Sequence, residues 1–172
     1  MMLSGREIMR QQGRGLQITP FDEKNINPNS YNLTLHDELL VYKNHVLDMK
    51  SKLETERIVI PAEGLLLKPG VLYLGRTVEH TSCDKFVPQI AGRSSIGRLG
   101  LCIHVTAGFG DIGFKGYWTL ELACVQPVKI YPKTKICQIY FHVIQGDYEL
   151  YGSNAKYQAS ANITPSLIYK EF

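Results

Sequence analysis

Short runs of alternating apolar and polar residues follow one another along most of the chain. Tyr31, Leu33 and Leu35 alternate with polar neighbours, a period of two that is typical of a half-buried β-strand. From Ile18 onward, further strands are predicted at 39–42, 56–60, 65–67, 71–78, 86–90, 101–106, 117–124, 128–130 and 136–143. Clusters of proline, glycine and asparagine separate these runs. Many short strands with closely spaced turns predict an all-β sandwich or barrel rather than alternating βαβ units.

One short helix is predicted at the N-terminus, over residues 3–13. Ser4 can cap its first turn, and Glu7 three residues later completes a capping box. Leu3 and Ile8 can pack on each other as a hydrophobic staple, and Gly13 is suited to end the helix. This helix is expected to have a structural role at the end of a sheet.

The length of 172 residues predicts one domain, 1–172, long enough to bury a core. Its hydrophobic share of 44% and charged share of 20% are ordinary for a globular protein. The segment from about residue 148 to 172 has no periodicity. We expect it to be ordered only where it docks, on a neighbouring subunit or on a ligand.

Charge and apolar patterning exclude several classes of partner. A net charge of +3 without a block of lysines and arginines argues against nucleic-acid binding, although a few arginines in a pocket can still bind a small anion. No apolar run approaches the length of about 18 residues that spans a membrane, and residues 1–12 lack the apolar stretch of a signal peptide. The four cysteines are widely spaced, which predicts buried, reduced thiols and a cytoplasmic protein.

The segment 92–121 combines two kinds of chemistry. At its start, Arg93, Ser94, Ser95 and Arg98 can converge on one anion, because arginine grips phosphate oxygens through two donors and a turn beginning at Ser94 offers hydroxyl and backbone N–H groups. A capped surface turn with two solvated arginines explains the same spacing equally well.

Two carboxylates follow in the same segment. In a strand over 117–124, Glu121 shares a face with Tyr117 and Thr119, so it can line a pocket and shuttle protons. Asp111 lies among glycines that permit close approach of the backbone to a ligand. The alternatives are an exposed glutamate on a half-buried strand and an aspartate that only shapes a turn.

Protein-bound zinc is not expected. Residues 36–38 read HDE, which formally matches the H-x-E of zinc nucleobase deaminases, but the P-C-x-x-C of that signature does not follow. We interpret His36 as an accidental match.

The motifs of this segment resemble those of the dCTP deaminase family, part of the trimeric dUTPase-like superfamily. Members carry G-R-S-S-x-x-R-L-G-L, H-x-T-A, D-x-G-[FW]-x-G and x-L-E. This chain has GRSS at 92–95, RLGL at 98–101, HVTA at 104–107, DIGFKG at 111–116 and LE at 120–121. Weaker similarities lie at 27–35, 67–79 and 151–166, so the resemblance covers most of the chain. It implies a distorted jelly-roll-like β-barrel and a homotrimer with active sites between subunits.

The resemblance also implies roles for individual residues. The expected catalytic residues are Glu121 as proton shuttle, with Arg98, Ser94 and Asp111. The expected nucleotide-binding residues are Arg93, Ser94, Ser95, Ile96, Gly97, Arg98, Ala107, Asp111, Thr119, Leu120, Glu121, Gln138, Tyr151, Lys156 and Gln158. Mg²⁺ would be held mainly by the triphosphate of dCTP or dUTP, without zinc, and dTTP is a possible inhibitor.

One position separates two kinds of family member. Deaminases that release dUTP resemble A-H-R after the H-x-T element, whereas bifunctional members that form dUMP resemble A-G-F. Here the residues are Ala107, Gly108 and Phe109, which favours deamination of dCTP coupled to triphosphate cleavage. A deaminase that stops at dUTP, a dUTP diphosphatase without deaminase activity, and a dNTP-binding trimer without turnover remain the alternatives.

Four residues depart from the family pattern. Asn32 stands where Asp is usual, Ala159 where Gly is usual and Ser160 where Gln is usual. Gly110 replaces an isoleucine before Asp111, a change expected to loosen that loop.

Overall fold

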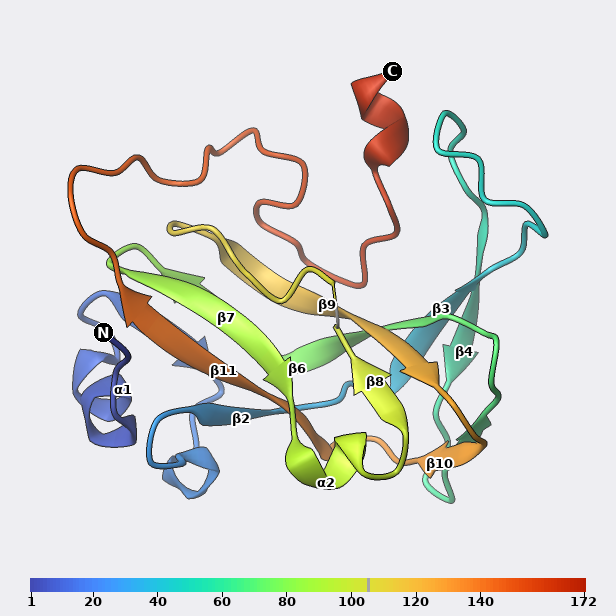
Figure 1. Cartoon of the computed structure of the whole chain (residues 1–172), viewed down its shortest axis with the longest axis horizontal. Helices are drawn as coiled ribbons and strands as arrows, with labels where there is room; N and C mark the ends of the chain where they lie inside the picture. The colour runs from blue at the N-terminus through green and yellow to red at the C-terminus, as the bar shows by residue number, and fades with distance from the viewer. Residues whose placement is uncertain (105) are drawn as a thin grey trace.

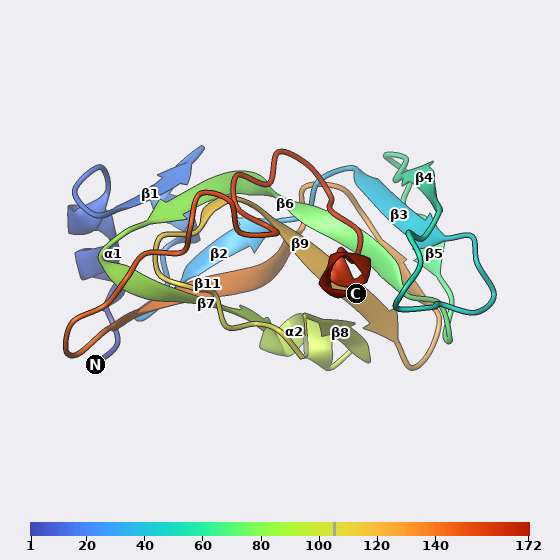
Figure 2. The ribbon, with the colours of Figure 1, turned by 90° about the horizontal axis from the view of Figure 1, so that it is seen from above.

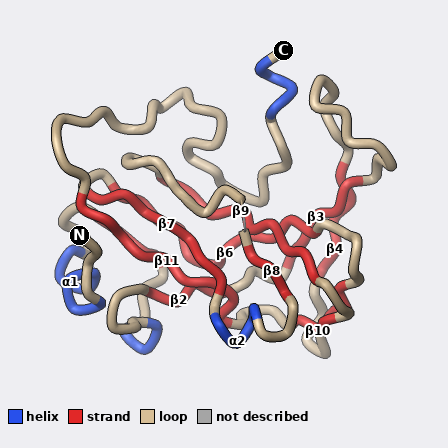
Figure 3. The backbone as a smooth tube through the Cα atoms, viewed as in Figure 1, coloured by secondary structure: helices blue, strands red, loops and turns tan. Residues whose placement is uncertain are grey.

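The computed structural model describes residues 1–104 and 106–172, and it is built almost entirely from β-strands (Figures 1 and 3). Its elements are α1 (Gly5–Gln11), β1 (Leu16–Thr19), η1 (Glu23–Asn25), β2 (Tyr31–Thr34), β3 (Glu38–Tyr42), β4 (Thr55–Val59), β5 (Leu65–Leu67), β6 (Tyr73–Cys83), β7 (Phe86–Gly92), α2 (Ser94–Gly97), β8 (Leu101–Ile103), β9 (Lys115–Cys124), β10 (Val128–Ile130), β11 (Lys135–Val143) and η2 (Ile168–Glu171). The predicted strands are confirmed with small shifts of their ends. The largest shift is in β6, which runs five residues beyond its predicted end. The part of the predicted strand 101–106 at Val105 lies outside the described residues.

Three antiparallel sheets form the body of the molecule. The largest has the order β4-β3-β6-β9-β8 with β1 paired to β6, the second has the order β2-β11-β7, and β10 pairs with β5. The all-β, jelly-roll-like prediction is confirmed, but the predicted barrel is wrong. Within the described residues no ladder joins the outer strands β4 and β8, so the large sheet stays open (Figures 1 and 2).

The core lies between the large sheet and the β2-β11-β7 sheet. On β9 the side chains of Leu120 and Leu122 are fully buried, whereas Tyr117, Thr119 and Glu121 on the opposite face are only half-buried. β11 buries Ile139 and Phe141 by the same alternation. The predicted division of β9 into two faces is therefore confirmed, because successive side chains of a strand point to opposite sides.

The N-terminal helix has the predicted cap. The Ser4 hydroxyl accepts a hydrogen bond from the Glu7 backbone N–H at 3.2 Å, and Ile8 is fully buried. Gly5 is needed here for close approach, because a Cβ atom at this position would lie 2.1 Å from the Asn27 carbonyl oxygen. α1 is thereby packed directly against the turn that leads into β2.

Three of the four cysteines are buried, as predicted, and the fourth is not. Burial raises the pKa of Cys83 to about 11. Cys102 is exposed because its neighbours Leu101 and Ile103 on β8 point into the core. The prediction of four buried thiols is wrong at this position.

The C-terminal segment docks on its own chain. It crosses the open side of β9 before ending in η2 (Figures 1 and 3). The Tyr117 N–H donates to the Ser160 carbonyl at 2.9 Å, and the Thr164 N–H donates to the Thr119 hydroxyl at 3.0 Å. Lys156 forms an ion pair with Glu171 in η2. Among the described residues, no helix is both long and apolar enough to cross a membrane.

A buried carboxylate joins the two main sheets. Glu79 on β6 is 3% exposed and accepts hydrogen bonds from the backbone N–H and the hydroxyl of Thr34 on β2, both at 2.8 Å. It lies at a bulge where β6 shifts register against β9 between Arg76 and His80. Burial raises the pKa of Glu79 above its ordinary value, and the Thr34 hydrogen bonds oppose that shift.

This shift predicts how stability depends on pH in the variant Glu79→Gln. A raised pKa in the folded state means that the stabilising contribution of Glu79 is complete below its unfolded pKa and is lost as pH rises through the folded pKa. The difference in unfolding free energy, wild type minus variant, should therefore be largest in acid and fall as pH rises. Denaturant titrations of both proteins at several pH values measure it. A difference that grows with pH would show that the Thr34 hydrogen bonds outweigh the effect of burial.

Candidate active site

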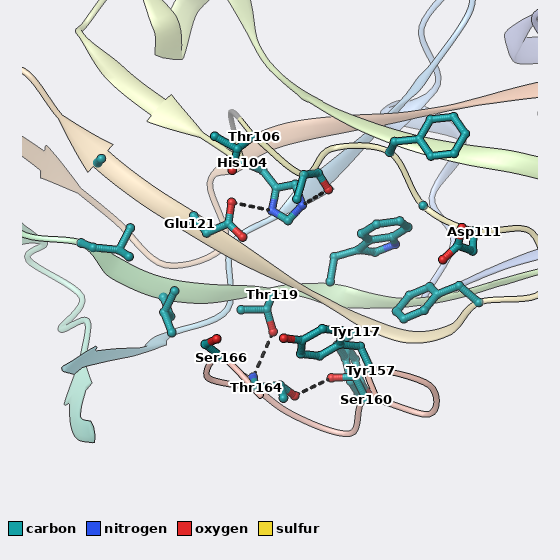
Figure 4. A pocket seen from close by; sticks show the side chains of 18 of the residues that line it. His104, Thr106, Asp111, Tyr117, Thr119, Glu121, Tyr157, Ser160, Thr164 and Ser166 are labelled. Atoms are coloured by element: carbon teal, nitrogen blue, oxygen red, sulfur yellow. Dashed lines mark hydrogen bonds and ion pairs between the residues drawn. The ribbon is translucent and has the colours of Figure 1, made fainter. Parts of the chain in front are cut away.

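A cavity of about 660 Å³ opens over β9, between the segment 104–114 and the C-terminal segment (Figure 4). Its volume is in the range of small-molecule sites. Of the predicted site residues it brings together Ala107, Phe109, Asp111, Thr119, Glu121 and Tyr151. Figure 4 shows Glu121 and Asp111 well separated along the cavity wall.

Glu121 faces a buried histidine. The Nδ1 atom of His104 lies 3.6 Å from Oε2 of Glu121, and the two side chains point toward one another (Figure 4). The backbone N–H of His104 also donates to the backbone carbonyl of Glu121 at 3.0 Å. The imidazole ring packs edge-on against Trp118, with ring centroids 6.4 Å apart. His104 has a φ of 52°, in the region that only glycine adopts freely, so the surrounding contacts hold it there.

The partner of the other ring nitrogen determines where the protons lie. Nε2 of His104 lies 2.6 Å from the Ala107 carbonyl oxygen, which can only accept, so Nε2 carries a proton. Nδ1 has no hydrogen-bond partner among the described residues, and it faces the carboxylate. Nδ1 can therefore accept or release a proton directly beside Glu121. His104 was not among the predicted site residues, although the HVTA motif contains it.

Gly108 and Gly110 allow the segment that follows His104 to pack closely against β7 and the Trp118 ring. A Cβ atom at Gly108 would lie 2.4 Å from the Ile90 carbonyl oxygen, and the Ile90 N–H donates to the Gly108 carbonyl at 2.7 Å. A Cβ atom at Gly110 would lie 2.3 Å from the Trp118 ring. Gly110 is buried, and a side chain at this position would have to displace the Trp118 ring, so the glycine lets the loop pack closely; its expected loosening effect stays a prediction.

The turn that was predicted to bind an anion, residues 93–98, lines a second cavity. α2 follows directly after β7, and a space of about 650 Å³ is lined by Arg93, Ser94 and Gly97. Cys102, His104, Thr106 and Phe109 line both cavities. Within one chain, the turn and Glu121 thus lie on two sides of a common wall. Ser95, Ile96 and Arg98 line neither cavity.

The remaining predicted binding residues make intramolecular contacts. Gln158 Oε1 accepts a hydrogen bond from the Lys115 N–H at 2.8 Å, and Gln158 Nε2 donates to the Gly113 carbonyl at 2.9 Å. These bonds attach the C-terminal segment to the start of β9. Lys156 is paired with Glu171. The Leu120 side chain is fully buried, so only its backbone is available to a ligand. Gln138 contacts Ser30 and Gly92.

Several cavity residues were not among the predicted site residues. Tyr42 on β3 and Tyr157, Thr164 and Ser166 of the C-terminal segment line the cavity with Glu121 (Figure 4). Tyr157, Thr164 and Ser166 lie in the segment 151–166 that resembles the family, but only the docking of this segment shows that they line the cavity, and Tyr42 had no motif signal.

His36, Asp37 and Glu38 form a compact polar group at the start of β3. Their ligand atoms lie within 4.8 Å of one another, and Glu38 is paired with Arg57. Burial lowers the pKa of His36. None of the three lines either cavity. The interpretation of His36 as an accidental match, with no bound zinc, stays a prediction.

Comparisons with known proteins agree with the motifs. A sequence model described as "dCTP deaminase-like" matches residues 2–144. Proteins called "dCTP deaminase, dUMP-forming" are 66% identical in Clostridium botulinum (strain Eklund 17B / Type B) and 64% identical in Clostridium beijerinckii, each over the whole chain and 99% of the relative. The Leptospira biflexa protein of the same name is 54% identical over the whole chain and 98% of the relative.

A solved structure supports the fold. The crystal structure of 2'-deoxycytidine 5'-triphosphate deaminase from Agrobacterium tumefaciens matches with a TM-score of 0.65 at 17% identity, over 83% of this chain. The chain spans about half, 48%, of that longer protein. Because the family model and the full-length relatives agree, this chain belongs to the dCTP deaminase-like family.

Proposed function

We propose that this protein is a zinc-independent dCTP deaminase that also cleaves the triphosphate, giving dUMP, ammonia and diphosphate. The observation that carries the proposal is the pairing of Glu121 with His104 in the wall of a cavity large enough for a nucleoside. Its full-length relatives bear the corresponding name.

Deamination at C4 of cytosine needs a base and then an acid at the same place. A carboxylate beside the ring can take a proton from the attacking water and deliver it to N3, and then carry the hydroxyl proton of the tetrahedral intermediate to the departing amine. Glu121 would do both, while Nδ1 of His104 takes up or returns the proton between the two steps. The backbone around Ala107 and at Thr119 to Glu121 would hold the pyrimidine.

Triphosphate cleavage would take place toward the Asp111 end of the cavity. Asp111 is exposed, and Gly108 and Phe109 lie between it and His104 in sequence. We propose that Asp111 orients a water for attack on the α-phosphorus. Mg²⁺ bound mainly by the triphosphate would neutralise the charge that develops there.

The separation of the predicted anion-binding turn from Glu121 favours an assembly of several copies, for which the family resemblance implies a homotrimer. In one chain these groups line different cavities, so a single copy does not present them together to one nucleotide. We propose that Arg93, Ser94, Ser95 and Arg98 of one copy complete the site over Glu121 of another. Inhibition by dTTP at this shared site and a cytoplasmic location belong to the same proposal.

The test is to incubate purified protein with dCTP and Mg²⁺ and to follow products by anion-exchange chromatography with an ammonia assay. We expect ammonia, dUMP and diphosphate in equal amounts. Ammonia with accumulating dUTP would leave only the deaminase activity. No ammonia would contradict the deaminase activity and make dUTP the next substrate to assay.

A further inference from the structure

A chain of polar side chains runs from β2 to the residue before the anion-binding turn. Asn32 Nδ2 donates to Asn27 Oδ1 at 3.1 Å, and Asn27 Nδ2 donates to Ser30 Oγ at 3.0 Å. Ser30 Oγ donates to Gln138 Oε1 at 2.8 Å, and Gln138 Nε2 donates to the Gly92 carbonyl at 3.2 Å. The five residues connect β2, the turn before it, β11 and the end of β7.

The donors in this chain all point the same way. Each of Asn27, Ser30 and Gln138 accepts one hydrogen bond and passes one on, so the orientation of one group sets the next. Ser30 is the link between the strands, because its single hydroxyl both accepts from Asn27 and donates to Gln138. Hydrogen bonds in such a series polarise one another, so breaking one weakens its neighbours.

The first residues of this hydrogen-bonded series are held in place by burial and by further backbone hydrogen bonds. Ser30 is 4% exposed and Asn32 is 5% exposed, so water does not readily replace their partners. The Asn27 N–H donates to the Ser30 carbonyl at 2.8 Å, and the Gly5 N–H of α1 donates to the Pro28 carbonyl at 2.8 Å. The turn 27–30 is therefore a fixed support rather than a mobile loop.

The last hydrogen bond of the series, from Gln138, holds the carbonyl of Gly92, the residue directly before Arg93. In the β7–β11 ladder, Gln138 lies opposite Ala91, one residue before Gly92. A second bond from the same strand reaches the turn, because Arg93 Nη1 donates to the Lys135 carbonyl at 2.8 Å. In addition to the Cys137–Gly92 pair of the ladder, two side-chain hydrogen bonds thus join β11 to Gly92 and Arg93. Figure 1 shows β2, β11 and β7 side by side, with α2 at the end of β7.

We propose that Ser30 is a positioning residue for the anion-binding turn, acting through Gln138 on the Gly92 carbonyl. This inference rests on the proposed function, in which that turn binds the triphosphate. Ser30 touches no ligand. It keeps the Gln138 amide oriented so that its N–H, and not its oxygen, meets the Gly92 carbonyl. Without the hydroxyl the amide can rotate, and the start of the turn loses one of its two side-chain supports.

The test compares Ser30→Ala, Gln138→Leu and the double variant with Thr34→Val. Thr34 is the matched control, since it lies on the same strand and loses one hydroxyl hydrogen bond, to Glu79, that is outside the polar chain. We expect Ser30→Ala to lower kcat/KM for dCTP about tenfold, which is the scale of one lost buried hydrogen bond. The double variant should have the same kcat/KM as Gln138→Leu, because both substitutions interrupt the same series of hydrogen bonds. Thr34→Val should lower Tm and leave kcat/KM within about twofold of wild type.

Amide hydrogen exchange of residues 92–98 without nucleotide supplies the second readout. Exchange should be faster in Ser30→Ala and Gln138→Leu and unchanged in Thr34→Val. The proposal is overturned if Ser30→Ala leaves exchange of this segment unchanged, if its kcat/KM stays at the wild-type value, or if the two substitutions have additive effects. If the wild type does not consume dCTP, the proposed function fails by itself, and the exchange data alone then decide whether Ser30 positions the turn.

Discussion

Replacing Glu121 by glutamine should lower kcat for dCTP deamination by about a thousandfold, the scale of a lost general acid–base group. Glutamine keeps the size of the side chain and its place beside His104, but it cannot take a proton from water. The Kd for dCTP should change by less than about fivefold, because the turn proposed to bind the triphosphate lines another cavity. Ammonia release and calorimetric binding measure the two effects separately.

A matched control for this variant is Glu56→Gln on β4. Glu56 is exposed on the outer strand of the large sheet, and it lines neither cavity. Its substitution should leave kcat unchanged. Deamination by Glu121→Gln at the wild-type rate would remove Glu121 from the mechanism and turn attention to His104 and Asp111.

Replacing Gly108 by alanine should separate the two activities. The new Cβ atom would lie 2.4 Å from the Ile90 carbonyl oxygen, so the backbone of 108–110 must move away from β7. That movement carries Phe109 and Asp111 with it, whereas Glu121 stays on β9. A misplacement on the ångström scale can lower a rate by up to about 100-fold, so triphosphate cleavage should fall by about 10- to 100-fold. Ammonia release should fall much less, and dUTP should accumulate as product.

Gly152→Ala provides the comparison for this substitution. No atom lies within 4 Å of a Cβ built at Gly152, so its replacement by alanine should leave the product ratio unchanged. Equal loss of ammonia and dUMP in Gly108→Ala would mean that the segment 107–110 serves deamination as much as cleavage. An unchanged ratio of dUMP to ammonia would contradict the role of Gly108 in the second activity.

The local features of the site could be predicted from neighbouring residues. The cap at Ser4 and the strand containing Glu121 follow from spacing over a few positions, and both are confirmed. A short helix at Ser94 follows in the same way. Similarity to the family motifs added Gly108 and Phe109 to the predicted site residues. The cap, the strand and the short helix were predicted correctly because capping, alternation and turn formation depend on residues close in sequence.

Contacts between distant segments could not be predicted. Alternation predicts that a strand is half-buried, but it does not predict whether the first and last strands of a sheet meet, so the barrel was wrong. The pairing of His104 with Glu121 and the bond from Ser30 to Gln138 span 17 and 108 positions of the chain.

The sequence by itself determined the all-β class, the N-terminal helix, the two faces of β9 and the family. Only the tertiary structure decided that Glu121 faces His104, that Gly110 is a packing position, and that the turn and the carboxylate lie in separate cavities. The physical reason is the range of the interactions. Backbone propensities and side-chain periodicity act over a few residues, whereas a cavity is formed by the packing of strands and loops that are far apart in sequence.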